Sequence, residues 1–205
     1  MKKRQDLPNY HKIDMSVDVN KILEVYNDNI EKLKDSPDYL NSSCGKPYLS
    51  ENGYIQIPVT NFNNAEGTYP NPASGNTPIG DERNYTELEE WAKGTYIEEV
   101  LNLFSEPTRT RFCVIEPGGY IKPHIDYNTD YSVRYQIPIT TNDWCHVGVQ
   151  RKGESPELVH LPADGSVWFM NQGYNHAAWN MGKTDRIHLI ICVNSQKELK
   201  SLLNK

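Results

Sequence analysis

Short extended runs separated by turn signals fill the chain from Thr108 onward. The turn signals are Pro117-Gly-Gly119, Asn142-Asp143, Lys152-Gly153 and Asp164-Gly165. Runs spaced at roughly 8–12 residues are typical of antiparallel strands in a β-sandwich or a β-barrel. The pattern predicts a mainly β core, and on its own it leaves a sandwich and a jelly roll as equal alternatives.

The first hundred residues differ in pattern from the rest of the chain. Asp18 is a candidate N-cap for an amphipathic helix, whose apolar positions are Val19, Ile22, Leu23, Tyr26, Ile30 and Leu33. A short strand is expected at Tyr54–Val59, and a second helix from Thr86, with Glu89 at the spacing of a capping box. The apolar positions of the second helix would pack outside the core; they are Leu88, Trp91, Ile97, Val100, Leu101 and Phe104.

The length of 205 residues suits one domain with a sizeable core. We expect residues 1–106 to form a buttress of helices and loops, and residues 107–195 to form the β core. The segment 62–81 is rich in Gly, Pro and Asn and has no periodicity. A loop of this length is either a functional lid or a disordered segment, and the sequence leaves both open.

Charge and cysteine spacing exclude some classes of partner. The formal net charge of −6 argues against a protein that binds the nucleic-acid backbone, which needs a basic surface. The four cysteines show no C-x-x-C spacing, so free thiols are expected: Cys44, Cys113, Cys145 and Cys192. No apolar segment suggests a signal peptide or a membrane helix. We expect a cytoplasmic protein without a membrane partner, and its oligomeric state is not readable.

Three potential metal ligands follow one another in the β region. His124 and Asp126 are two positions apart, and His176 comes fifty-two positions after His124. Because alternate residues of a strand share a face, the first two can bind one metal ion. Two imidazoles and one carboxylate are the ligand set that leaves open positions on non-haem Fe(II). The alternative is that His124 and Asp126 form a surface ion pair and that His176 is an unrelated loop histidine. The order of the three residues on predicted strands favours the metal site over this alternative.

Arg186 begins a further run of alternating character, ten positions after His176. Arg186 and His188 would share one face of this strand, opposite Ile187, Leu189 and Ile191. A guanidinium binds a carboxylate through two parallel hydrogen bonds. The run therefore suggests a binding site for a dicarboxylate cosubstrate on the same side as the imidazoles.

Several motifs in this order resemble the aspartyl/asparaginyl β-hydroxylase family of Fe(II)/2-oxoglutarate-dependent dioxygenases. They are Arg111–Asp126, Arg134–Ile139, Gly165–Trp168, Asn175–Asn180 and Arg186–Leu189. The resemblance covers roughly residues 107 to 195. It implies a double-stranded β-helix, the cupin-like jelly-roll core of these oxygenases, with flanking helices.

The resemblance also implies roles for single residues. His124, Asp126 and His176 would be the Fe(II) ligands and catalytic centre, with 2-oxoglutarate and O2 as cosubstrates. Arg186 would bind the distal carboxylate of 2-oxoglutarate, and Arg134 would lie near the cosubstrate or substrate. Gln136 stands where better-known members have a histidine, so it donates a hydrogen bond but carries no charge. His188 and Trp168 are further candidates for the cosubstrate site, although core packing is the alternative for Trp168.

The implied activity is hydroxylation of an aliphatic carbon with release of succinate and CO2. Asp126 favours hydroxylation over halogenation, because related halogenases replace this carboxylate. The expected substrate is a free amino acid or a short peptide segment. One alternative is an aspartyl, asparaginyl or prolyl residue in an intact protein. The other class is a non-oxidative metal-binding cupin or a 2-oxoglutarate sensor.

Overall fold

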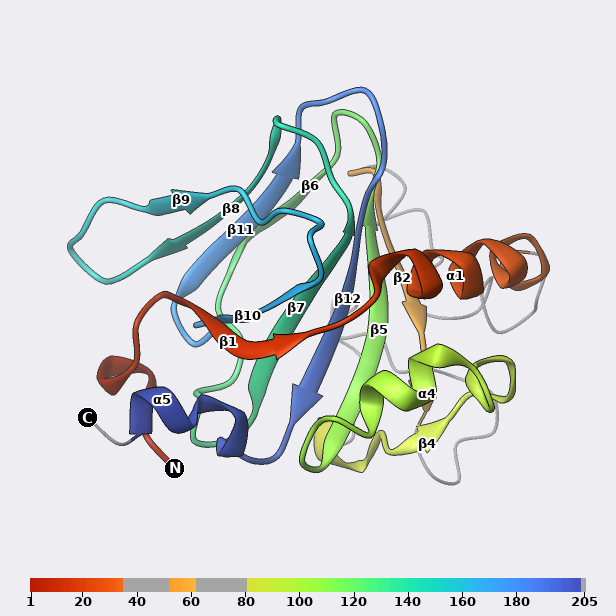
Figure 1. The fold of residues 1–205 in the computed structure, drawn as a ribbon. Helices are drawn as coiled ribbons and strands as arrows, with labels where there is room; N and C mark the ends of the chain where they lie inside the picture. Colours follow the sequence, from red (N-terminus) through yellow and green to blue (C-terminus); the bar gives the residue numbers. More distant parts are fainter. Residues whose placement is uncertain (35–51, 62–80, 204–205) are drawn as a thin grey trace.

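Two antiparallel β-sheets pack face to face in the computed structural model, which describes residues 1–34, 52–61 and 81–203 (Figure 1). The larger sheet has the order β1 (Tyr10–Ser16), β10 (Ser166–Met170), β7 (Val133–Thr140), β12 (Arg186–Val193), β5 (Pro107–Ile115) and β2 (Tyr54–Pro58). The smaller sheet has the order β6 (Tyr120–His124), β11 (Asn175–Asn180), β8 (Cys145–Gln150) and β9 (Glu157–Val159). A separate pair joins β3 (Thr60–Asn61) to β4 (Glu87–Leu88).

The strands from β5 to β12 form a jelly roll. Along the chain they pass between the sheets, so that β5, β7, β10 and β12 lie in the larger sheet and β6, β8, β9 and β11 lie in the smaller one. The first and last of these strands, β5 and β12, are neighbours in the larger sheet. This double Greek-key arrangement confirms the predicted fold class and resolves the alternative that the sequence left open.

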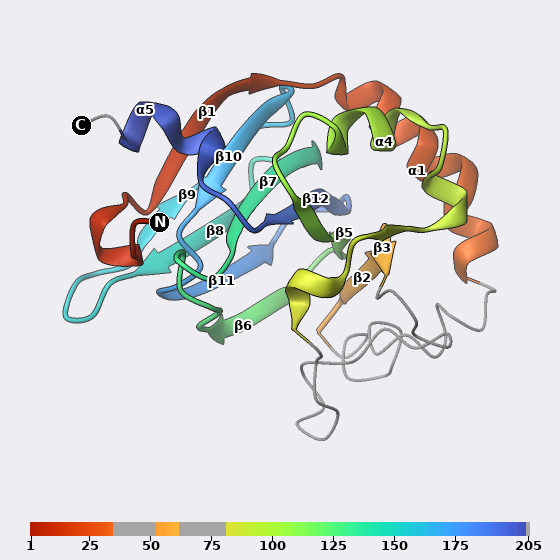
Figure 2. The same ribbon diagram turned by 90° about the horizontal axis from the view of Figure 1, so that it is seen from below.

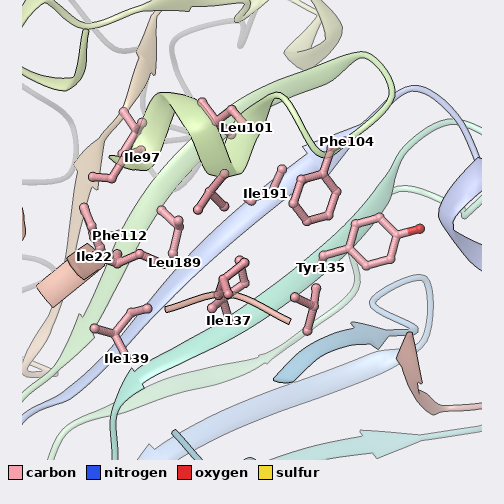
Figure 3. Packing of buried hydrophobic residues seen from close by; sticks show 14 of the residues in the cluster. Ile22, Ile97, Leu101, Phe104, Phe112, Tyr135, Ile137, Ile139, Leu189 and Ile191 are labelled. Atoms are coloured by element: carbon pink, nitrogen blue, oxygen red, sulfur yellow. The ribbon is translucent and has the colours of Figure 1, made fainter. Parts of the chain in front are cut away.

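Helices cover the outer face of the larger sheet, away from the smaller sheet (Figure 2). They are α1 (Val19–Lys34) and α4 (Tyr96–Leu101). Their apolar side chains pack onto the sheet in one large cluster, in which Ile22 and Ile97 meet Phe112, Ile137 and Leu189 (Figure 3). A smaller cluster, between the sheets, includes Ile115, Val147, Val149 and Met170. Short helical turns complete the described chain: η1 (Arg4–Asp6), η3 (Glu82–Asn84), η4 (Glu90–Ala92), η5 (Lys197–Leu199) and α5 (Lys200–Leu203).

The first predicted helix and the first predicted strand are confirmed. The helix α1 begins at Val19, and Asp18 Oδ1 accepts hydrogen bonds from the backbone N–H groups of Asn20 and Lys21, as an N-cap does. The strand β2 ends at Pro58, one residue before the predicted end. Side chains of Leu33 and its neighbours at the end of α1 lie outside the described set.

The prediction of a helix starting at Thr86 is wrong. Residues 87–88 pair with β3 as strand β4, and the α-helix starts only at Tyr96, capped by the side chain of Thr95. Gly94 separates the two segments with a φ of +70°, which breaks a continuous helix. The capping-box spacing at Thr86 and Glu89 does not start a helix. The predicted packing of Ile97, Val100 and Leu101 against the outside of the β core is confirmed.

Strand β1 was not predicted. Residues 10–16 pair with β10 at one edge of the larger sheet, so His11 lies on a strand. Its Nε2 lies 2.9 Å from Ser201 Oγ. The N-terminal segment thus adds β1 and β2 to the sheet, in addition to the helical buttress expected for residues 1–106.

Three of the predicted thiols are free in the described part of the chain, namely Cys113, Cys145 and Cys192. Cys44 and the predicted loop at 62–81, apart from Asp81, lie outside the described residues. Within the described segments, every helix is too short or too polar to cross a membrane.

Candidate metal centre

Neighbouring strands of the smaller sheet carry the two predicted histidine ligands. His124 is the last residue of β6 and is paired in register with His176, near the start of β11. Their ring centroids are 4.1 Å apart. Asp126 lies just beyond the end of β6, where its backbone N–H donates to the carbonyl of Gln172. The structure brings the three residues together, but the i, i+2 alternation expected within one strand is not the reason, because β6 has already ended.

The donor atoms of the three residues face one another. They lie within 4.8 Å of each other. Asp126 Oδ2 is 3.4 Å from His176 Nε2 and 3.9 Å from His124 Nε2. Two imidazole nitrogens and a carboxylate oxygen that converge in this way could hold a metal ion.

The second nitrogen of each imidazole lies against a backbone carbonyl. His124 Nδ1 is 2.7 Å from the oxygen of Lys122, and His176 Nδ1 is 3.0 Å from the oxygen of Tyr174. A carbonyl only accepts, so both Nδ1 atoms carry the proton and both Nε2 atoms present a lone pair. Metal-binding histidines are oriented in this way by the hydrogen bond of their other nitrogen.

Both imidazoles are held neutral, as metal binding requires. Burial lowers the pKa of His124 to about 4, and the neighbouring His176 contributes in the same direction. Burial likewise lowers the pKa of His176 to about 4, against the hydrogen bond to Tyr174. The side chain of His176 is 5% exposed, whereas that of His124 is 42% exposed, so solvent screens His124 more strongly.

Arg134 connects the site to residues that sequence reasoning missed. Its Nη1 donates to Asp126 Oδ2 and, at 3.1 Å, to Gln172 Oε1, while its Nη2 donates to Glu82 Oε2 at 2.9 Å. Arg134 was predicted near the cosubstrate or substrate, and the structure places it beside the carboxylate of the triad. Glu82 precedes the predicted core by 25 residues and belongs to no motif, so only the fold reveals it.

Arg186, His188 and Gln136 form a second polar group on the inner face of the larger sheet. Arg186 Nη2 lies 3.0 Å from His188 Nδ1, which is 2.9 Å from Gln136 Oε1. All three are buried, and burial lowers the pKa of Arg186 to about 10 and that of His188 well below its usual value. The predicted sharing of a face by Arg186 and His188 is observed, and Leu189 and Ile191 lie on the opposite face (Figure 3).

Two buried polar atoms in this part of the molecule have no partner among the described residues. They are His188 Nε2 and Trp168 Nε1. Trp168 is on β10, opposite Gln136 of β7. It also packs against the cluster between the sheets, as the core-packing alternative predicted. Orphaned buried groups cost roughly 1–3 kcal/mol each. A polar ligand between the sheets would relieve that cost.

A jelly roll that carries two imidazoles and one carboxylate at one end defines a class, the metal-dependent cupin-like proteins. The model of the family "aspartyl/asparaginyl beta-hydroxylase" matches residues 92–195, slightly more than half of the chain. The chain belongs to this family, as its motifs predicted. The donor set of the triad is consistent with iron.

Three solved structures resemble this chain distantly. An oxidoreductase of the 2OG-Fe(II) oxygenase family from Burkholderia pseudomallei is 16% identical over 69% of this chain and 68% of its own, with a TM-score of 0.41. The oxalate decarboxylase of Lactobacillus farciminis is 20% identical over 43% and 24%, with a TM-score of 0.36. The capsular polysaccharide assembling protein CapF of Staphylococcus aureus is 13% identical over 42% and 23%, with a TM-score of 0.36.

The chain thus spans about a quarter of the length of the latter two proteins. No curated protein matches the chain.

Proposed function

We propose that the protein is an Fe(II)- and 2-oxoglutarate-dependent dioxygenase that hydroxylates an aliphatic carbon of an amino acid or a short peptide segment. Succinate and CO2 would be the co-products. The observation that carries this proposal is Arg186, a buried guanidinium with no carboxylate at ion-pair distance among the described residues. A buried charge is costly unless it is paired, and a dicarboxylate cosubstrate would supply the missing anion.

His124, Asp126 and His176 would hold the iron through Nε2, one carboxylate oxygen and Nε2. The neutral imidazoles and the ionised carboxylate leave one net positive charge on such a centre, which favours an anionic cosubstrate. When bound, Fe(II) with O2 and 2-oxoglutarate supplies the oxidising power that breaks an unactivated C–H bond. The residues of this chain hold the metal, orient the cosubstrate and limit access by water.

His188 would share the distal carboxylate of the cosubstrate with Arg186. His188 Nδ1 can accept from Arg186 or donate to Gln136, but it cannot do both. Acceptance from Arg186 leaves the proton on Nε2, the buried nitrogen without a partner in the described chain. A carboxylate selects this tautomer, because only a protonated Nε2 can donate to it. In this tautomer Gln136 Oε1 accepts only from Arg186 Nη2, at 3.5 Å, while Gln136 Nε2 donates to Met170 Sδ at 3.0 Å.

The substrate would reach the metal from the side where the triad is open. His124 is partly exposed there, and the residues flanking Asp126 are among the more exposed large apolar side chains: Ile125 at 61% and Tyr127 at 45%. The ring of Tyr127 lies tilted against that of Tyr131, with 4.3 Å between the ring centroids. An exposed apolar and aromatic rim beside the metal ligands suits contact with the aliphatic part of a substrate.

The test is 2-oxoglutarate turnover in the presence of free amino acids, short peptides and intact proteins, with Asp126→Ala as the inactive control. We expect succinate formation that one of the first two groups stimulates, together with a product that has gained one oxygen atom. Turnover with an intact protein alone would favour a protein hydroxylase. Binding of 2-oxoglutarate without stimulated succinate would favour a sensor, and absence of binding would favour a non-oxidative cupin.

A further inference from the structure

Glu82 is a fully buried carboxylate on an otherwise exposed turn. It is the first residue of η3, where Asp81 Oδ1 accepts from the backbone N–H of Arg83 at 3.0 Å and caps the turn. Asp81 and Arg83 pair with each other at the surface, with side chains 32% and 45% exposed. The side chain of Glu82 is 0% exposed. The turn therefore directs one carboxylate inward while its neighbours remain in contact with water.

Two arginines from different strands share one oxygen of this carboxylate. Glu82 Oε2 accepts from Arg134 Nη2 of β7 and from Arg109 Nη1 of β5, each at 2.9 Å. Burial raises the pKa of Glu82, but Arg134 and Arg109 outweigh it and hold the pKa at about 2. The carboxylate is ionised near neutral pH, and it links two strands of the larger sheet to η3.

The backbone of β5 is distorted at the point where Arg109 reaches Glu82. Ile190 and Cys192 of β12 pair with Arg111 and Thr108, so β5 carries one extra residue there, a β-bulge. Arg109 itself has a φ of +30°, in the region that residues other than glycine rarely adopt. Such strain persists only where the surroundings hold it. The bulge changes the direction of the Arg109 side chain, which forms the buried bond to Glu82.

Arg134 continues this connection to the candidate metal centre. While its Nη2 is bound to Glu82, its Nη1 donates to Asp126 Oδ2. This is the oxygen that faces both histidines. An oxygen of a carboxylate has two lone pairs, so Asp126 Oδ2 can accept from Arg134 and still bind a metal ion. One guanidinium thus joins a buried anion to the carboxylate of the triad.

We propose that Glu82 is a positioning residue for the metal centre, acting through Arg134 on Asp126. The proposal rests on the proposed function, in that the triad must hold a metal ion. Without Glu82, the charge of Arg134 would be balanced by Asp126 alone, and guanidinium and carboxylate favour a bidentate pair that uses both oxygens. That pair would compete with the metal for Asp126. By binding Nη2 of Arg134, Glu82 would prevent this bidentate pair and leave Asp126 Oδ2 facing the histidines.

The competing explanation is that Glu82 only fastens η3 to the sheet through Arg109. Such a role would affect stability but not the properties of the metal centre. Anaerobic titration of the metal-free protein with Co(II) separates the two, because visible Co(II) absorption reports both affinity and ligand geometry. The variants are Glu82→Gln, which keeps the shape and removes the charge, and Asp81→Asn, which removes a carboxylate from the same turn at the surface.

We expect Glu82→Gln to weaken Co(II) binding by roughly 10–100-fold, the usual loss for partners of metal ligands, and to change the Co(II) spectrum. Asp81→Asn should stay within about twofold of the wild type, since the Asp81 side chain binds Arg83 and Tyr131 rather than Arg134 or the triad in the described structure, and a surface ion pair contributes little. In an Arg134→Gln background, Glu82→Gln should cause no further loss, because Glu82 acts through Arg134.

Wild-type affinity and spectrum in Glu82→Gln, with a lower melting temperature alone, would overturn the proposal and leave the proposed function standing. A full additional loss in the Arg134→Gln background would overturn it as well. If Glu82→Gln does not fold, Arg134→Lys takes its place, since a lysine cannot span two carboxylates as a guanidinium does; wild-type affinity in that variant would reject the proposal. A wild-type protein that binds no Co(II) would overturn the metal centre and the proposal together.

Discussion

The two faces of the larger sheet differ in composition although the same strands build them. On the outer face, Tyr135 and Ile137 of β7 and Leu189 and Ile191 of β12 pack under the helices (Figure 3). On the inner face, the alternate positions of the same two strands include four buried polar residues, Arg134, Gln136, Arg186 and His188. The apolar face stabilises the domain through burial. The polar face costs stability unless ligands or ion pairs satisfy it, and we propose it as part of the functional site.

Removal of a proposed metal ligand, on the smaller sheet that packs against this inner face, should have the largest effect. We expect His176→Ala to lower metal affinity by more than about 100-fold, beyond the loss that partners of ligands show. The melting temperature of the metal-free protein should change little in comparison, because the site contributes no apolar packing. Metal titration and thermal unfolding of the same variant check both statements, and retained tight binding would show that His176 is not a ligand.

The outer face should give the opposite result. Leu189 is fully buried in the cluster under the helices. Leu189→Ala should reduce the free energy of unfolding by about 2–5 kcal/mol through lost burial and a cavity. The metal affinity of the folded protein should stay near that of the wild type. Urea unfolding measures the first quantity, and a large loss of affinity in the folded variant would show that the two faces are not independent.

The pH dependence of the unfolding free energy tests whether buried Glu82 is ionised in the folded protein. Its pKa falls from 4.5 in the unfolded chain to about 2 in the folded protein, so the ionised form stabilises the fold above pH 4.5. That contribution, about 3 kcal/mol, is lost as the pH falls from 4.5 toward 2. The difference in unfolding free energy between wild type and Glu82→Gln should therefore shrink over this window. Parallel curves for the two metal-free proteins would contradict the ionised, paired state of Glu82.

A helix cap should have the smallest effect. Thr95 Oγ1 accepts from the backbone N–H of Ile97 at the start of α4, which covers the outer face. Thr95→Ala should lower the free energy of unfolding by about 1 kcal/mol and leave metal binding unchanged. Unfolding curves with Thr95→Ser as the matched control measure it; a loss in the serine variant as large as in the alanine variant would point to the methyl group rather than to the cap.

Local periodicity explains what the sequence could predict. The alternation in Arg186–Val193 separates the apolar and the polar face of β12 as expected, and the helix at Val19 follows its apolar spacing. The order of His124, Asp126 and His176 identified a group that the fold brings together. These features depend on residues close in the chain or on motifs shared by a family.

The missed features depend on contacts between distant residues. Glu82 meets Arg109 and Arg134, which lie 27 and 52 positions away, and nothing near it in the sequence marks it as buried. Strand β1 pairs with β10, which is distant in the chain. Its exposed Lys12, Asp14 and Ser16 do alternate with the inward-facing Ile13 and Met15, but this signal covers only a short segment. The helix placed at Thr86 followed a local capping pattern, but pairing of β4 with β3 overrode it.

The central claim is that the inner face binds a dicarboxylate beside iron, with Arg186 at its distal end. Anaerobic titration of the Fe(II)-loaded protein with 2-oxoglutarate tests it most directly, through the weak visible charge-transfer band of the complex. We expect a saturable band in the wild type and a requirement for at least about tenfold more cosubstrate in Arg186→Ala, as loss of a charged hydrogen bond predicts. No band in folded, iron-loaded wild type, or identical curves for both proteins, would contradict the account.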